Sequence, residues 1–147
     1  MKKRITPTPL GLPVGALLLA MAAGACTSSP TASTSTTSTA PTLAQIQTQI
    51  FDPGCSPCHT DVGRTPSGGL NLKAGSAFAN LVNVQSTGLP GAVRVIAGNA
   101  NGSYIVQKLE GAPTIAGLRM PRNGPPFLTD AQVKMIRDWI TAGAANN

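Results

Sequence analysis

The stretch Cys55-Ser56-Pro57-Cys58-His59 carries the strongest pattern in this sequence. It places two thiols two residues apart and a histidine directly after the second thiol. The chain of 147 residues holds only three cysteines and one histidine, and the remaining cysteine, Cys26, stands 29 positions before the pair. These counts exclude a disulfide-rich scaffold and any metal site built from several histidines.

Several chemistries use two cysteines at this spacing. A structural zinc site needs four ligands, commonly two cysteine pairs, and this sequence has no second pair. A thioredoxin-like dithiol belongs in a βαβ context, which the sequence does not indicate. A plain disulfide between Cys55 and Cys58 would leave His59 without a role. The motif therefore favours one covalently attached haem, in which each thiol adds to one vinyl group and the histidine ligates the iron.

A second axial ligand for the iron must come from a residue other than histidine, because His59 is the only one. Methionine is the usual partner. Two of the four methionines fall in the N-terminal leader, and Met135 falls at mid-helix, where a core role fits better. Met120 follows His59 by 61 residues and lies in a loop, 111–126, with seven Gly or Pro among its 16 residues. We therefore predict Met120 as the second ligand, presented by a loop that prolines stiffen.

The N-terminus has the pattern of an export signal. Three basic residues, 2–4, precede a run of 16 apolar, Gly or Pro residues from Leu10 to Ala25. This run is shorter than the ~20 residues that a membrane-spanning helix needs. It ends in small residues before Cys26, which predicts a lipoprotein signal peptide over 1–25 and lipidation of Cys26. An ordinary cleaved secretory signal is the alternative interpretation.

The segment after the signal has the composition of a tether. Of the 15 residues from Thr27 to Pro41, 11 are Ser or Thr, so the segment has little apolar surface to bury. We predict a disordered tether over 26–42 and one folded domain over 43–147. Such a protein would be exported and lipid-anchored to a membrane, on the periplasmic or cell-surface side.

Apolar spacing within the predicted domain indicates an all-α fold of about four short helices joined by long Gly- and Pro-rich loops. The first helix would begin at Leu43 and stop at a breaker, Asp52-Pro53-Gly54. The last would begin with a Thr129–Gln132 capping box and end at Gly143. The two middle helices are expected over 74–83 and over 102–110, the latter capped by Asn99 or Asn101, and residues 93–96 could form a strand fragment.

Charge and the remaining side chains narrow the range of possible functions. The formal charge is +6, and with residues 2–4 set aside it is 8 − 5 = +3, too weak and scattered for a nucleic-acid interface. No Ser/His/Asp arrangement or paired carboxylate is evident, and a histidine used as an iron ligand is lost to acid–base chemistry. These observations predict no catalytic residues and no enzymatic activity.

The layout of helix, C-x-x-C-H, Gly-rich loop, middle helices, Met-Pro loop and C-terminal amphipathic helix resembles class I c-type cytochromes over residues 43–145. The resemblance implies that the first and last helices cross near the haem edge. It also implies that residues 68–72 close over the haem. Residues of the first helix would then meet residues of the last: Ile46, Ile50 or Phe51 against Val133, Ile136 or Trp139.

The function that this resemblance implies is single-electron transfer by a membrane-anchored monohaem cytochrome c, or by an electron-entry subunit of an oxidoreductase, with redox proteins as partners. The alternatives are a five-coordinate haem c sensor or enzyme subunit, and a surface lipoprotein without haem that has a C-x-x-C disulfide. Five further side chains could contact haem propionates or a partner, or could be ordinary solvated loop residues: Lys73, Arg94, Tyr104, Arg119 and Arg122.

Overall fold

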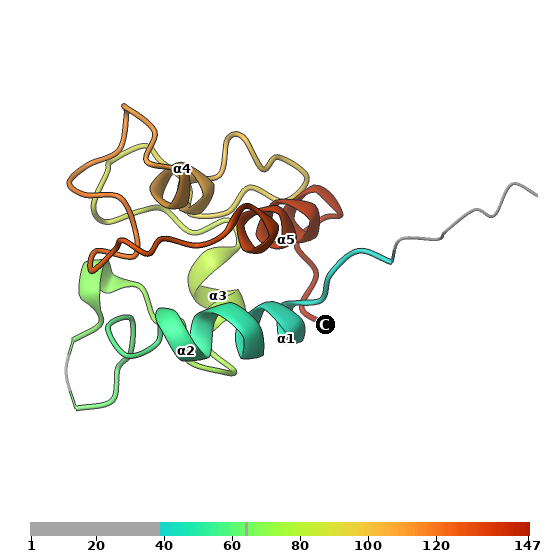
Figure 1. Ribbon diagram of the computed structural model, residues 1–147, viewed down its shortest axis with the longest axis horizontal. Coiled ribbons are helices and arrows are strands. Elements are labelled where there is room, and N and C mark those ends of the chain that lie inside the picture. The colour runs from blue at the N-terminus through green and yellow to red at the C-terminus, as the bar shows by residue number, and fades with distance from the viewer. Residues whose placement is uncertain (1–38, 64) are drawn as a thin grey trace, which may run out of the picture. The chain divides into compact units, whose positions relative to one another are not determined.

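The computed structural model describes residues 39–63 and 65–147 (Figure 1). The predicted signal peptide, Cys26 and most of the predicted tether lie outside these residues. The described part is built from helices, turns and loops, and no strand occurs in it. Residues 93–96, expected as a possible strand fragment, form only isolated bridges with Val82, Gln85 and Asn99. Within the same residues, no helix combines the length and apolar character needed to cross a membrane.

The first helix continues beyond the point where the sequence predicted a break. α1 (Leu43–Ile46) begins with a Thr42–Gln45 capping box, passes into the π-helix η1 (Gln47–Phe51) and ends as α2 (Asp52–Gly54). The predicted breaker is therefore wrong. In the π-helix, Asp52 donates its N–H to the carbonyl of Gln47, one residue further back than in an α-helix. Proline has no backbone N–H, and none is needed in the first turn of α2.

The two middle helices are shorter than predicted. α3 spans Ala77–Leu81 and α4 spans Tyr104–Glu110. Gly111 follows α4 in the left-handed conformation that ends many helices, as predicted. The predicted caps Asn99 and Asn101 are wrong, because Ser103 is the N-cap and makes no side-chain capping bond. Ser103 instead donates its hydroxyl to the carbonyl of Asn99 at 2.7 Å.

The last helix agrees with its prediction. α5 spans Asp130–Thr141, and Thr129 and Gln132 form the expected capping box. Gly143 lies just after it at φ 106°. Four side chains of α5 are buried: Val133, Ile136, Trp139 and Ile140. Met135 is half-buried and packs against the core, as its predicted core role requires.

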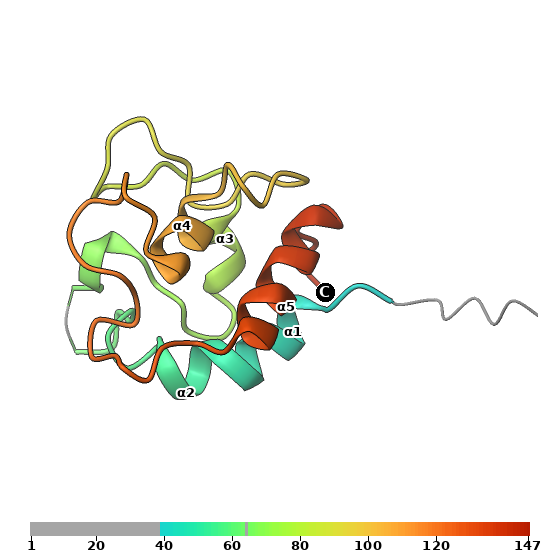
Figure 2. The same cartoon turned by 45° about the horizontal axis from the view of Figure 1, so that its top comes forward.

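One hydrophobic core joins the first helical segment to the last helix. α1 contacts α5, and the two cross in Figure 2. The buried cluster contains Ile46, Ile50 and Phe51 from the first segment together with the buried residues of α5. The chain end closes the same region, since Asn147 accepts hydrogen bonds from the N–H groups of Leu43 and Ala44 at 2.9 Å each.

Candidate functional site

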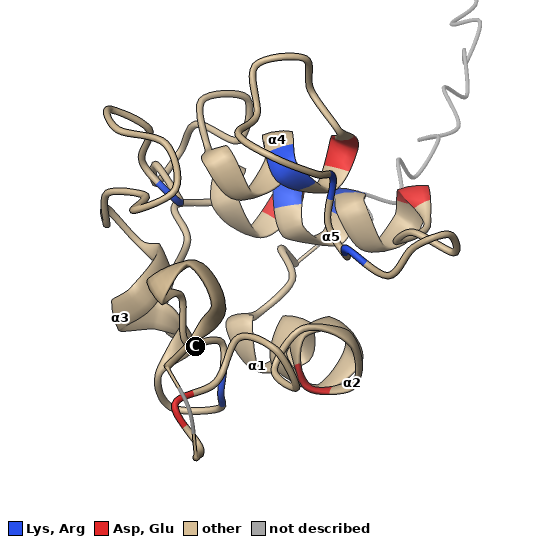
Figure 3. Cartoon of the chain, turned by 90° about the vertical axis from the view of Figure 1, so that its left-hand side faces the viewer, with Lys and Arg blue, Asp and Glu red and all other residues tan. Residues whose placement is uncertain are grey.

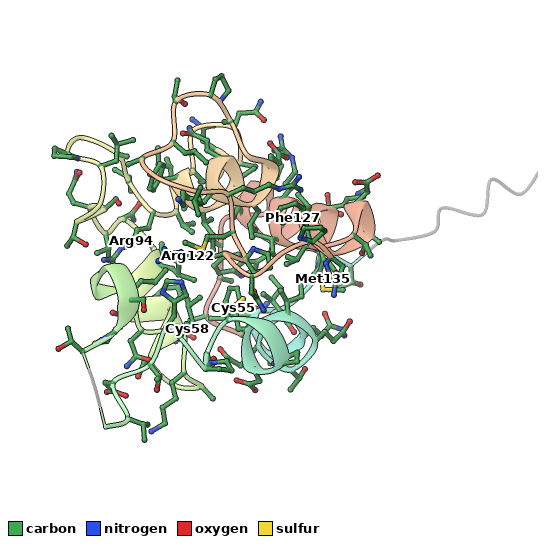
Figure 4. All side chains as sticks on the ribbon, turned by 60° about the vertical axis from the view of Figure 1, so that its left-hand side comes forward. Cys55, Cys58, Arg94, Arg122, Phe127 and Met135 are labelled. Atoms are coloured by element: carbon green, nitrogen blue, oxygen red, sulfur yellow. The ribbon has the colours of Figure 1, made fainter. Side chains whose placement is uncertain are left out.

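The C-x-x-C-H motif follows α2 directly and winds into another turn. The N–H groups of Cys55 and Ser56 both donate to the carbonyl oxygen of Phe51, at 2.9 and 2.8 Å. The N–H groups of Cys58 and His59 both donate to the carbonyl oxygen of Cys55, at 3.1 and 2.9 Å. The first helix therefore fixes where the motif begins, and the backbone turn presents its side chains (Figure 4).

The two thiols of the motif stand in different surroundings. Cys55 is half-buried against the hydrophobic core, and its thiol donates to the carbonyl of Ile50 at 3.6 Å. Burial, with a smaller contribution from Cys58, raises the pKa of Cys55 to about 11. Cys58 is exposed, and both residues are free thiols. The pair thus offers one inward and one outward sulfur, both in the reduced form that thioether formation needs.

The ring of His59 is oriented by a backbone carbonyl. Its Nδ1 lies 2.8 Å from the carbonyl oxygen of Ser67. A carbonyl can only accept, so Nδ1 carries the proton and the lone pair of the neutral ring is on Nε2. This is the arrangement by which histidines that bind metals are commonly held, with one nitrogen donating to a carbonyl and the other ligating.

Ser67 belongs to a tight turn that follows the motif. This turn, η2 (Ser67–Gly69), has Gly68 at φ 64° and Gly69 at φ 60°. Two successive residues in the left-handed region favour glycine strongly, which explains the Gly-Gly pair. Ser67 donates its N–H back to the carbonyl of Cys58 at 3.3 Å. Hydrogen bonds in both directions therefore link the turn to the motif.

Leu72 provides a second link between the motif and the loop that follows it. Its N–H donates to the carbonyl of His59 at 2.8 Å. Its own carbonyl accepts from the Ser56 hydroxyl at 2.8 Å and from the buried side chain of Gln47 at 2.9 Å. The loop is thereby tied to η1 as well as to the motif.

Met120 is half-buried and packs against the same core as Cys55. Its backbone is fastened to the end of α4, since the Met120 N–H donates to the carbonyl of Lys108 at 2.9 Å. The Lys108 ammonium donates to the carbonyls of Ala116 and Leu118 in the same loop. Burial lowers the pKa of Lys108 from its usual value. The loop that carries Met120 is thus held at several points.

The five further candidates have separate surroundings. Arg94 is buried, and Tyr104 is buried and accepts from the N–H of Ala116. Arg119 donates to the carbonyl of Leu109 at 2.7 Å and lies over the Phe127 ring, 4.1 Å from its centroid. Lys73 and Arg122 are exposed. The interpretation of all five as solvated side chains is therefore wrong for Arg94 and Tyr104.

Charge is unevenly distributed over the described residues. Figure 3 shows that most of the described ribbon is uncharged and that α4 and α5 carry many of its charged residues. No group of three His, Cys, Asp or Glu side chains among residues 39–63 and 65–147 could hold a metal ion. Two surface pockets, of about 240 and 330 Å³, lie beside α1 and beside α5, and the motif lines neither of them.

Sequence reasoning missed the contacts that organise the site. Ser67, Leu72 and Lys108 act through backbone carbonyls or through a side chain that reaches along a loop. Nothing in their residue types signals these contacts. Comparison with protein-family models, with curated proteins and with solved structures finds no match. The function is therefore inferred from the motif and its surroundings.

Proposed function

We propose that this chain is a membrane-anchored monohaem cytochrome c with a small cytochrome c fold, and that it carries single electrons between redox proteins. Cys55 and Cys58 would hold the haem through thioethers. His59 and Met120 would ligate the iron. Cys26 would carry the lipid, and residues 26–42 would link the lipid to the domain.

The observation that carries this proposal is the orientation of His59. Its Nδ1 is engaged by the Ser67 carbonyl 2.8 Å away, and the two thiols before it are free. A C-x-x-C disulfide would need neither feature. A histidine with a protonated Nδ1 has its lone pair on Nε2, which is the nitrogen an iron ion would use.

Two features of the surroundings would serve such a group. A haem supplies reversible one-electron chemistry when it is bound. The chain's own residues would set its environment: the helical core excludes water beside Cys55, and the loop that Lys108 holds presents Met120. Methionine as the second ligand favours a higher reduction potential than histidine would. The helical fold of residues 39–63 and 65–147, in which no strand occurs, is compatible with this use.

A spectrum tests the proposal. The full chain is expressed in cells with haem-attachment machinery, and the mature protein is examined as its pyridine haemochrome. We expect one c-type haem per chain. The variant Cys55→Ser, Cys58→Ser should lose covalent haem, whereas the neighbouring Ser56→Ala should keep it. A colourless protein made beside a control cytochrome that does acquire haem would overturn the proposal.

A further inference from the structure

Arg94 is a buried cation without an acidic partner. Only 6% of its surface is exposed, and none of the ion pairs in the described part of the chain involves it. A buried charge is costly unless hydrogen bonds compensate it. The Arg94 guanidinium obtains these bonds from three backbone carbonyls, through both of its terminal nitrogens.

Two of those three carbonyls belong to η2. The Nη2 of Arg94 donates to the carbonyls of Gly68 at 3.2 Å and Gly69 at 3.0 Å, and Nη1 donates to the carbonyl of Asn80 at 2.9 Å. The hydroxyl of Thr87 also donates to the Gly68 carbonyl, at 2.6 Å. Arg94 therefore connects η2 to α3, to which Asn80 belongs.

The neighbouring carbonyl in the same turn faces the candidate iron ligand. Ser67 precedes Gly68, and its carbonyl accepts from Nδ1 of His59 at 2.8 Å. The Ser67 carbonyl also accepts from the N–H of Leu70 at 3.3 Å, and this bond closes the turn around Gly68 and Gly69. A side chain that fixes the carbonyls of Gly68 and Gly69 consequently restricts the carbonyl of Ser67 as well.

We infer that Arg94 is a positioning residue for His59, acting through η2 to hold the Ser67 carbonyl against the imidazole ring. Its effect on electron transfer rests on the proposed function, since His59 would matter there as an iron ligand. A carbonyl held firmly on Nδ1–H makes the ring a better electron donor to a metal. A better donor stabilises the oxidised metal and lowers its reduction potential.

The test compares variants that separate geometry from charge. Arg94→Lys keeps the charge and loses the planar fork, whereas Arg94→Gln loses the charge. Thr87→Val removes a second donor to the Gly68 carbonyl with no change of charge. Arg137→Lys is the matched control, because Arg137 bonds Glu110 and Asn101 on other elements. Each is made in the full, haem-loaded chain.

Two quantities are measured in the reduced protein: the solvent exchange rate of the His59 Nδ1 proton by NMR, and the reduction potential by spectroelectrochemistry. We expect Arg94→Lys to speed the exchange at least tenfold and to raise the potential. Thr87→Val should shift both in the same direction by less, and Arg137→Lys should shift neither. If Arg94→Lys fails to fold, the exchange rate and the potential of Thr87→Val alone test the inference.

Two outcomes overturn the inference. In the first, Arg94→Lys and Thr87→Val lower the melting temperature but leave the exchange rate and the potential unchanged, so that Arg94 is structural only. In the second, Arg94→Lys has no effect while Arg94→Gln lowers the potential, so that only charge matters. Haem content of the unmutated chain tests the proposed function separately. If no haem is bound, the Nδ1 proton is followed in the haem-free chain, where the same coupling is measured.

Discussion

The backbone N–H of Met120 donates to the carbonyl oxygen of Lys108 at 2.9 Å, across 12 positions of the chain. This bond places the candidate iron ligand beside the last turn of α4. The Lys108 side chain adds to it by donating to the carbonyls of Ala116 and Leu118. Backbone and side chain of one residue thus hold both the ligand and the loop that leads to it.

Replacing Met120 by alanine should remove the second axial ligand in the proposed cytochrome. We expect the variant to lose its sulfur-to-iron charge-transfer band and to bind carbon monoxide when reduced. Met135→Ala is the matched control, because Met135 is also half-buried against the core but lies within α5. A Met120→Ala protein that keeps the band, or a Met135→Ala protein that loses it, would contradict the assignment. Absorption spectra of both variants measure this.

Replacing Lys108 by methionine should loosen the loop 112–120 while keeping much of the apolar length of the side chain. Each lost bond from a charged donor weakens the loop by about 1.5–3 kcal/mol at most, and less for a partly exposed group. We therefore expect amide hydrogen exchange in this loop to speed up by roughly tenfold or more. Lys134→Met is the control, since the Lys134 side chain is 72% exposed. Equal exchange in both variants would show that Lys108 does not hold the loop.

The two thiols of the haem-free, reduced chain should react with an alkylating reagent in a fixed order. Cys58 is exposed and should react first. With a pKa of about 11, Cys55 is thiolate in only about one molecule in a thousand at pH 8. Its rate should rise about tenfold per pH unit until the pH approaches 11, because only the thiolate reacts.

Mass spectrometry after timed quenching separates the two modifications. Cys58→Ser isolates the slow thiol and should accelerate it somewhat, since the Cys58 charge contributes to raising the Cys55 pKa. In denaturant the two rates should converge. Equal rates in the native chain at pH 8 would refute the burial of Cys55 on which this order depends.

Two glycines of the Met120 loop should respond differently to alanine. Gly111 and Gly117 both have positive φ, 74° and 70°, so each substitution strains the backbone. A Cβ on Gly111 would also lie 3.0 Å from Cδ of Arg119, whereas nothing lies within 4 Å at Gly117. Gly111→Ala should therefore destabilise the chain by about 1 kcal/mol more than Gly117→Ala. Denaturant unfolding of both variants checks this, and an equal loss would contradict the contact.

Local signals in the sequence predicted α5 and the end of α4 well. A capping box such as Thr129–Gln132 and a glycine such as Gly111 act within one helical turn, so residue types alone reveal them. The prediction of a break at Asp52–Gly54 was wrong because a π-turn accommodates the proline. No residue type signals a π-turn in the sequence. The same holds for the cap of α4, where Ser103 takes the place expected for asparagine.

The candidate site was only half predictable for a related reason. The motif identifies its candidate residues directly, and the composition of the loop favours Met120 over the other methionines. The groups that orient them are carbonyls, which every residue has, so Ser67 carries no signal. Arg94 was predicted only as a charged side chain that could contact a propionate or a partner. Its contacts with η2 join it to residues 25 and 26 positions earlier in the chain. Only the folded chain brings these together.

Asn147 joins the last described residue to the first helix, so that the described fold forms a closed ring. Its main-chain and side-chain oxygens satisfy N–H groups at the first turn of α1, which an isolated helix would leave to water. We therefore expect fraying at residue 147 to weaken the first turn of α1, which the Thr42–Gln45 capping box still caps. The order of the elements around the ring then matters more than where the chain is cut, so a permuted chain that joins residues 147 and 42 and opens at an exposed loop should keep the same core.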